Sequence, residues 1–322
     1  ENPFFLYYAL NQPHVPRTPN PRFVGKSGMG PRGDVILEAD FCVGEIIKTL
    51  KEEGVLDNTL IVFSSDNGPV LNDGYYDDSV EKLGSHKPNG PLRGGKYSLL
   101  EAGTRVPFFT YWKGKIKPLV SDALVCQIDL LESIAKLVNV DVKSTDSQEL
   151  LDVFMGKSAI GRTNLVIEAN TKTAFRQGDW MMIPPYPGDP ILEEVNIEMG
   201  NDKEFQLYNL KKDIGQKNNL AKDQPKKLKE LKENFELIRG NSYKNVEKIE
   251  FYYPEQQQFP PKEKYFDTEG FFEWNGFLYI FTKSRVKNEI GRTFLYKIPN
   301  KVGNHSAELI SDFTTCPDKG CW

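Results

Sequence analysis

The spacing of apolar residues along the first 140 positions alternates between the periods of helices and strands. Apolar side chains recur every three or four residues over 34–53, which predicts a helix, and Gly54 is a typical helix terminator. The same spacing over 122–138 predicts a second helix, with Ser121 or Asp122 as its cap. Short continuous apolar runs predict buried strands over 3–10, 59–64 and 106–112. This alternation of strands and helices predicts an α/β fold with mainly parallel strand pairing.

The pattern changes after about residue 140, where the apolar runs become shorter. A basic amphipathic helix is predicted over 225–239, with a proline at its start and Gly240 at its end. We expect residues 141–240 to form a small α+β subdomain that closes against an α/β core of residues 1–140. Strands of this subdomain are predicted over 165–169, 174–183 (with a break at 177–179) and 204–210.

From residue 241 the pattern changes again, to one typical of antiparallel strands. The run 271–282 is interrupted by Asn275-Gly276, a pair typical of a two-residue hairpin turn. Two further strands are predicted over 293–298 and 307–310. We therefore expect residues 241–322 to form an antiparallel β meander, which resembles a fragment of a secreted β-propeller.

Composition narrows the class of protein. Of the 322 residues, 39% are hydrophobic and 27% are charged, which is typical of a globular chain with a sizeable core. The formal net charge of -4 gives no general reason to expect a nucleic-acid partner. No apolar run approaches the ~20 residues that span a bilayer, so we expect no transmembrane segment. The oligomeric state stays open.

Asp66 and Asn67 directly follow the predicted strand 59–64. Open α/β sheets place their sites at the carboxyl ends of strands. A carboxylate beside an amide supplies oxygen ligands of the kind that Ca²⁺ or Mg²⁺ prefers. Asp-Asn-Gly is also a common turn sequence, so a metal site and an ordinary turn both remain open from these residues alone.

His14 lies between Pro13 and Pro16, shortly after the predicted strand 3–10. The two prolines restrict the backbone around it. A histidine held in this way can donate a proton or bind an anion. An ordinary loop histidine is the alternative.

A third candidate is the turn Gly94-Gly95-Lys96. Two glycines let a backbone approach a ligand closely, and the lysine is a compact cation for an oxyanion such as sulfate or phosphate. The turn is not a phosphate-binding loop of the Walker A type, because the first glycine and the Lys-Ser/Thr ending are absent. A glycine turn with a solvated lysine is the alternative.

These three features occur in the order histidine loop, Asp-Asn-Gly, Gly-Gly-Lys, each beside a predicted strand. In this combination the chain resembles the sulfatase family of the alkaline-phosphatase superfamily, over roughly residues 1–240. The resemblance implies an alkaline-phosphatase-like α/β sandwich. The matching stretches are PFFLYYALNQPHVP, PRFVGKSGMGPRGDVILEADFCVGEIIKTL, NTLIVFSSDNGPV, PLRGGKYSLLEAGTRVPFFTYW and FQLYNLKKDIGQKNNLA.

The resemblance implies a role for each candidate residue. Asp66 and Asn67 match two ligands of the family's Ca²⁺, and Lys96 matches the lysine that contacts the sulfate. His14 matches the histidine that contacts the sulfate or assists the leaving group. His86, shortly before the Gly-Gly-Lys turn, is expected to reach the substrate, with a surface loop residue as the alternative. The implied reaction is hydrolysis of a sulfate ester by attack of a formylglycine hydrate on sulfur.

The residue that starts this chemistry has no match in the sequence. Formylglycine forms from Cys or Ser in a Cys/Ser-x-Pro-x-Arg motif, and no part of the chain fits that motif. The family's aspartate pair, which supplies further calcium ligands, has no match before His14. We therefore expect an N-terminally truncated sulfatase, with the formylglycine and half of the calcium site upstream and no turnover by this chain alone.

The expected function is Ca²⁺-dependent hydrolysis of a sulfated small molecule or glycan, in the periplasm or outside the cell as the family implies. One alternative is a phosphodiesterase or phosphonate hydrolase of the same superfamily. Its usual zinc sites favour histidine ligands, and this chain has only three histidines. The other alternative is a non-catalytic glycan-binding or scaffold protein.

Overall fold

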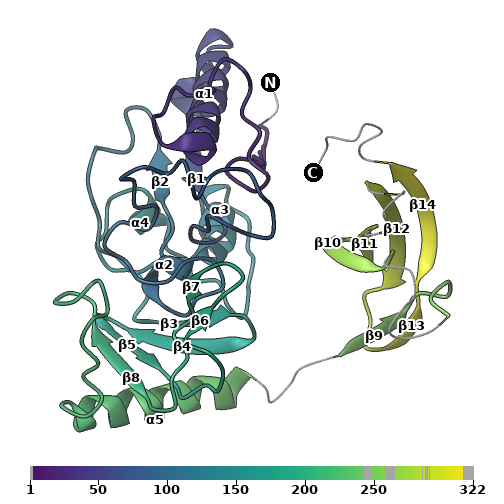
Figure 1. Cartoon of the computed structure of the whole chain (residues 1–322). Helices are drawn as coiled ribbons and strands as arrows, with labels where there is room; N and C mark the ends of the chain where they lie inside the picture. Colours follow the sequence, from purple (N-terminus) through teal and green to yellow (C-terminus); the bar gives the residue numbers. More distant parts are fainter. Residues whose placement is uncertain are drawn as a thin grey trace. The chain divides into compact units, whose positions relative to one another are not determined.

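The structure is a computed structural model that divides into two compact units, Glu1–Leu237 and Ile238–Trp322, each described here by itself (Figure 1). Within them, the structure describes residues 3–242, 248–257, 265–284, 286, 289 and 291–314.

The helix predicted near the N-terminus is confirmed as α1, Gly30–Glu52. Its first turn is fastened to the preceding loop by the buried side chain of Asp34. The Asp34 carboxylate accepts hydrogen bonds from the backbone N–H groups of Gly25 and Ser27, at 2.8 and 2.9 Å. Burial alone would raise the pKa of Asp34, but these bonds and the Ser27 hydroxyl lower it. No helix in the described residues, α1 included, is long and apolar enough to cross a membrane.

Two predicted strands of the first unit are confirmed as β1, Ile61–Ser64, and β2, Phe108–Tyr111. The expectation of mainly parallel pairing is wrong for them, because they pair antiparallel, with Ile61 opposite Tyr111. A parallel pair needs a long crossover that returns the chain to the same end of the sheet, usually through a helix. The connection between β1 and β2 instead runs through loops and one short helix, α2, Glu101–Thr104.

The buried strand predicted over 3–10 is not formed in the described residues. Phe5 is 78% exposed and Tyr7 is 82% exposed, and the backbone there has no regular secondary structure. A strand needs a hydrogen-bonded neighbour and a cover for its apolar side chains. No segment that the structure describes pairs with this one, so the apolar pattern alone does not produce a strand.

The helix predicted over 122–138 begins later than expected, as α3, Leu130–Leu137. The buried Asp129 carboxylate accepts a hydrogen bond from the backbone N–H of Cys126, at 2.8 Å, and forms an ion pair with Arg162. This distant arginine fixes where the helical segment starts, so the predicted caps at 121 and 122 are wrong. The remaining short helices of this part are the 3-10 helices Leu56–Asn58 and Gln127–Asp129 and the α-helix α4, Leu151–Phe154.

The predicted strands of residues 141–240 are confirmed and form one antiparallel sheet in the order β3-β4-β5-β8. The predicted break at 177–179 is the turn between β4 and β5. The sheet strands are β3, Asn164–Ala169, β4, Lys172–Gln177, β5, Trp180–Ile183, and β8, Gln206–Asn209, and a separate small hairpin consists of β6, Ile191–Leu192, and β7, Ile197–Glu198.

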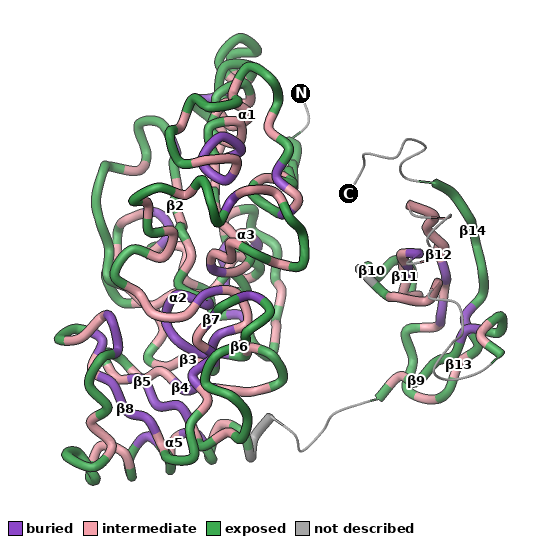
Figure 2. The backbone as a smooth tube through the Cα atoms, viewed as in Figure 1, coloured by how far each residue is buried: buried purple, intermediate pink, exposed green. Residues whose placement is uncertain are grey.

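This sheet is covered on both faces, and buried residues lie along β4, β5 and β8 (Figure 2). On one face, Leu99 and Leu100 from the loop before α2 join a buried cluster with Met181 of β5. The helix predicted over 225–239 is confirmed as α5, Pro225–Ser242. Phe235 of α5 stacks on Phe175 of β4, with ring centroids 5.5 Å apart. The loop that carries Leu99 is therefore anchored in the core of the sheet.

The second unit contains the predicted meander, a four-stranded antiparallel sheet in the order β10-β11-β12-β14. The Asn-Gly hairpin is confirmed, with φ of 51° at Asn275 and 76° at Gly276, as a two-residue turn of this type requires. The relation to a β-propeller stays a prediction. The strands are β10, Asp267–Trp274, β11, Phe277–Lys283, β12, Arg292–Pro299, and β14, Glu308–Thr314, while β9, Ile249–Tyr252, and β13, Gly303–Ser306, pair parallel.

The stacking of α5 on the sheet leads to a stability prediction. Phe235→Ala removes a buried ring, so we expect the free energy of unfolding of the first unit to fall by about 3–5 kcal/mol. Leu237→Ala on the same helix is the control, because Leu237 is 66% exposed and its loss costs about 0.5 kcal/mol or less. Urea unfolding followed by circular dichroism measures both, and equal losses would contradict the packing described.

Candidate active site

The Asp66-Asn67 loop lies directly against the turn at α2, with backbone touching backbone. The backbone N–H of Gly68 donates a hydrogen bond to the carbonyl oxygen of Gly103, at 2.8 Å. A Cβ atom on Gly68 would lie 1.6 Å from the carbonyl oxygen of Ala102. A side chain at position 68 therefore cannot be accommodated, and glycine is what lets the two segments meet.

The Gly-Gly-Lys turn also approaches the same loop too closely for a side chain. A Cβ atom on Gly95 would lie 2.4 Å from the carbonyl oxygen of Pro69. That carbonyl accepts a hydrogen bond from the backbone N–H of Lys96, at 3.0 Å. Gly94 has a φ of 82°, in the left-handed region that glycine enters without strain. The turn is thus held against the Asp66-Asn67 loop.

A buried arginine ties the histidine loop to the chain that follows Pro69. Arg17 and Asp77 form an ion pair at 3.1 Å, with side chains that are 2% and 6% exposed. Burial lowers the pKa of Arg17, and Asp77 acts against that effect. Arg17 follows His14 by three residues in the same loop, so these bonds fix the position of the loop that carries His14. The guanidinium also donates to three backbone carbonyl groups, those of Pro13, Val70 and Leu71.

Lys96 is held by Asp73, a residue that no sequence motif identified. One oxygen of the Asp73 carboxylate accepts a hydrogen bond from Lys96 Nζ at 2.7 Å, and the other accepts one from the Tyr97 hydroxyl at 2.8 Å. Burial would lower the pKa of Lys96, but the hydrogen bond and charge of Asp73 raise it. Burial would raise the pKa of Asp73, but Lys96, Tyr97 and the charge of His14 lower it. His14 is therefore close enough for its charge to act on this cluster.

His14 itself is exposed, and its ring has one defined contact. Nδ1 lies 2.7 Å from the carbonyl oxygen of Val15. Because a carbonyl oxygen only accepts hydrogen bonds, Nδ1 carries the proton in the neutral ring. Nε2 is then the nitrogen that can accept a proton, and once protonated it can donate a hydrogen bond to an anion.

The geometry of Asp66 and Asn67 is compatible with the prediction that they bind a metal ion. Asp66 is exposed, and its Oδ1 accepts a hydrogen bond from the backbone N–H of Asn67 at 2.9 Å. Asn67 Nδ2 donates to the carbonyl oxygen of Gly68 at 2.9 Å, so Asn67 Oδ1 remains as an acceptor. The described residues contain no group of three or more His, Cys, Asp or Glu side chains arranged to hold a metal ion. The pair is thus part of a calcium site at most, since Ca²⁺ takes about 6–8 oxygen ligands.

His86 is not brought into this cluster by any contact that the structure describes. It is half-buried in the loop between Lys82 and Pro91. Its expected contact with substrate stays a prediction.

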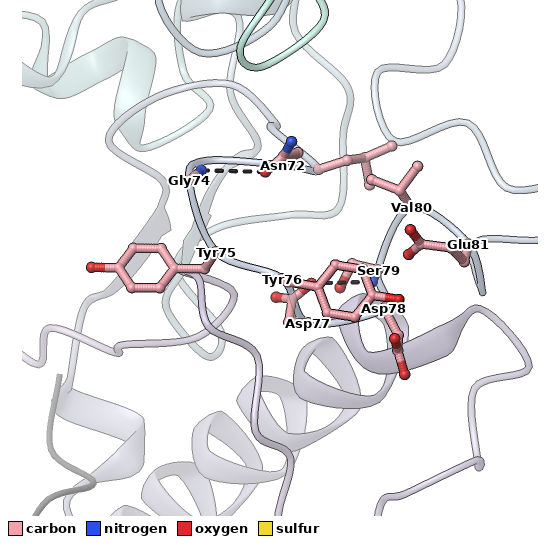
Figure 3. A pocket seen from close by; sticks show the side chains of 10 residues that line it. Asn72, Gly74, Tyr75, Tyr76, Asp77, Asp78, Ser79, Val80 and Glu81 are labelled. Carbon is pink, nitrogen blue, oxygen red and sulfur yellow. Dashed lines mark hydrogen bonds between the residues drawn. The ribbon is translucent and has the colours of Figure 1, made fainter.

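The segment after Asp73 encloses a hollow of about 320 Å³ (Figure 3). Three carboxylates contribute to its wall and no lysine or arginine does. A site with this charge repels a sulfate group, so we do not place the anion there. The lining residues are Leu71, Asn72, Gly74, Tyr75, Tyr76, Asp77, Asp78, Ser79, Val80 and Glu81.

The late stretch that resembles the family also reaches this region. The buried side chain of Gln216 accepts a hydrogen bond from the backbone N–H of Glu101, at 2.7 Å. Arg93, just before the Gly-Gly-Lys turn, donates to the carbonyl oxygen of Gln216 and pairs with Glu198. The turn is therefore held by the β6-β7 hairpin and by the loop after β8 as well.

Comparison with known proteins shows what this chain is similar to. Residues 1–140 match the family model named Sulfatase. N-acetylgalactosamine-6-O-sulfatase of Bacteroides thetaiotaomicron is 45% identical over 243 residues, which is 74% of this chain and 48% of that protein. Human arylsulfatase A is 32% identical over 167 residues, which is 51% of this chain and 31% of that protein.

Solved structures agree on the fold. One from Bacteroides thetaiotaomicron, described with the metabolism of multiple glycosaminoglycans, has a TM-score of 0.72 and 45% identity and covers 74% of this chain and 51% of its own. The PsFucS1 sulfatase of Pseudoalteromonas sp. has a TM-score of 0.60 at 24% identity and covers 73% of this chain and 48% of its own. The first unit thus has the alkaline-phosphatase-like fold of sulfatases. The chain belongs to the sulfatase family and spans about half of these proteins or less.

The close approach at Gly68 can be tested by substitution. Gly68→Ala places a methyl group against the Ala102 carbonyl, so we expect the free energy of unfolding to fall by about 3 kcal/mol or more. Gly44→Ala in α1 is the control, because nothing lies within 4 Å of its Cβ position. There alanine should stabilise the helix by about 1 kcal/mol. Thermal unfolding distinguishes the two, and a stable Gly68→Ala variant would show that the loops are not packed in this way.

Proposed function

We propose that the whole protein to which this chain belongs hydrolyses sulfate esters, and that this chain contributes the anion-binding lysine and part of the metal site. The observation that carries the proposal is the convergence of three loops, those of His14, Asp66-Asn67 and Lys96. Close glycine contacts and the buried Arg17 hold them together. A cation, a histidine and two oxygen donors on one set of loops suit an anionic ester.

We propose Ca²⁺ as the metal held by Asp66 and Asn67. Both residues offer oxygen atoms, which suit Ca²⁺, and neither offers the nitrogen or sulfur that zinc favours. The remaining ligands would come from water, from substrate and from parts of the protein outside this chain. Bound there, the ion would draw charge from the oxygen atoms of the sulfate group.

The protein side chains divide the other tasks. Lys96 would bind a sulfate oxygen with N–H groups that it does not donate to Asp73. His14, whose Nδ1–H donates to the carbonyl oxygen of Val15, would in its charged form present Nε2–H either to a sulfate oxygen or as a proton donor to the leaving oxygen. The nucleophile is assigned to the part of the protein outside these 322 residues, as formylglycine.

The substrate class follows from chemistry and from relatives. N-acetylgalactosamine-6-O-sulfatase of Bacteroides thetaiotaomicron bears the name of a sulfated amino sugar. We propose a sulfated glycan or its fragment as substrate, and a periplasmic or extracellular place of action, where such glycans are met. The sheet of the second unit would be a separate module.

Sulfate release by the whole protein tests this function. We expect release from a sulfated N-acetylhexosamine or an aryl sulfate, and no release by the 322-residue chain alone. Lys96→Ala should lower kcat/KM by about 100-fold or more, because a charge-assisted contact in the transition state is lost. Lys113→Ala is the control, since Lys113 is an exposed partner of Asp57. Preferred turnover of a phosphodiester would favour the superfamily alternative, and binding of glycan without hydrolysis would favour a non-catalytic role.

Metal removal tests the calcium proposal separately. A chelator should abolish sulfate release by the whole protein, and added Ca²⁺ should restore it. Asp66→Asn should raise the Ca²⁺ concentration for half-maximal activity by about 10-fold or more, because the ligand loses its charge. Asp57→Asn should leave that concentration unchanged. Activity that survives complete chelation would contradict the assignment.

A further inference from the structure

The pairing of Lys96 with Asp73 is not explained by sulfate binding alone. A carboxylate beside a cation that binds anions weakens the attraction of that cation for the ligand. Yet Asp73 is nearly buried, with its side chain 10% exposed, and both of its oxygen atoms are used, at 2.7 and 2.8 Å. We therefore expect Asp73 to have an effect on Lys96 other than weaker anion binding.

The backbone at the site shows that Asp73 holds more than the lysine. Tyr97 has a φ of 79°, a conformation that costs a side chain other than glycine about 1–2 kcal/mol. The hydrogen bond from its hydroxyl to Asp73 is one of the contacts that keep it there. Because Lys96 directly precedes Tyr97, the Asp73 carboxylate fixes both the side chain of Lys96 and the backbone next to it.

The hydrogen-bonding capacity of the ammonium group leaves room for a substrate. An ammonium has three N–H donors, and the contact with Asp73 uses one, while the ring centroid of Tyr97 lies 5.2 Å from Nζ. The other two are then held in defined directions. The lysine is therefore oriented by Asp73 without being blocked by it.

The charge of Asp73 also affects how strongly anions of different charge bind at Lys96. Asp73 and Lys96 together carry no net charge, so an anion meets an attraction from the near ammonium and a repulsion from the carboxylate behind it. A sulfate ester carries one negative charge, whereas a phosphate monoester carries about two above its second pKa of about 6. The attraction to Lys96 and the repulsion from Asp73 both double with the charge of the ester, so the presence of Asp73 weakens the binding of the phosphate monoester by about twice as much free energy as that of the sulfate ester.

We propose that Asp73 is a positioning and specificity-determining residue, which orients Lys96 and Tyr97 and reduces the advantage that a doubly charged ester anion would otherwise have over a singly charged one at Lys96. The proposal rests on the proposed function only in taking Lys96 as the residue that binds the ester. It goes beyond it by assigning the selection of charge to a residue of the 70–77 segment, outside every motif recognised in the sequence.

The orientation of Lys96 is tested without turnover, by NMR titration of its side chain in the full chain. Burial of Lys96 persists in Asp73→Asn while the compensating charge is lost, so the pKa of Lys96 should fall by at least about 1. Asp78→Asn removes a charge from the same segment, but Asp78 pairs with Lys82 and not with Lys96, so the pKa of Lys96 should not change. An unchanged pKa of Lys96 in Asp73→Asn would overturn the proposal.

Charge selection is tested on the whole protein at about pH 8, where a phosphate monoester carries about two charges. For the wild type and both variants, KM for an aryl sulfate and Ki for phenyl phosphate are measured. Asp73→Asn should lower the ratio of Ki to KM by about tenfold, because the repulsion of the dianion is lost. Asp78→Asn should leave the ratio within about twofold. An unchanged ratio in Asp73→Asn would overturn charge selection.

The two proposals fail in different ways. Absence of sulfate release by the wild-type protein would overturn the proposed function, and the titration of Lys96 would still decide whether Asp73 orients it. Binding of sulfate and phosphate esters in that case is measured by their displacement of each other from the wild type and Asp73→Asn. Near-ultraviolet circular dichroism confirms that the variants are folded.

Discussion

The contact between the backbones at Gly68 and Gly103 is the constraint on which the candidate site depends. At this point the loop after β1 and the turn at α2 are closer than any side chain permits. The hydrogen bond from Gly68 to Gly103 fixes their register, and Gly95 repeats the same approach one loop further on. Short-range packing of this kind leaves a loop no freedom to move independently, so residues far apart in sequence keep their relative positions.

Buried charged side chains hold the loops together in addition to the close glycine contacts. Arg17 binds three carbonyl groups and Asp77, so it joins the histidine loop to the segment that carries Asp73. A buried arginine without these partners would cost several kcal/mol, which is why the segments are held together strongly. Asp73 lies in that segment and holds the side chain of Lys96 through a hydrogen bond. Lys96, the proposed anion-binding residue, is thus oriented by a chain of polar contacts rather than by its own turn alone.

Much of the local structure could be predicted from the sequence, and the errors share a cause. The helix α1, the strands β3, β4, β5 and β8, and the Asn-Gly hairpin follow from apolar spacing and turn residues. The pairing of β1 with β2, the start of α3 and the state of residues 3–10 depend on distant partners. Arg162, which anchors Asp129 before α3, lies too far along the chain for local pattern to reveal it.

The sequence by itself determined the family and selected His14, Asp66, Asn67 and Lys96 as candidate site residues, because residue types at fixed spacing identify a motif whether or not the chain is folded. Only the tertiary structure decided how those residues are held. Asp73, Arg17 and Asp77 belong to no motif, and their importance appears when loops separated by 23 to 60 residues come into contact. The physical reason is that hydrogen bonds and ion pairs act over a few ångströms in space and take no account of distance along the chain.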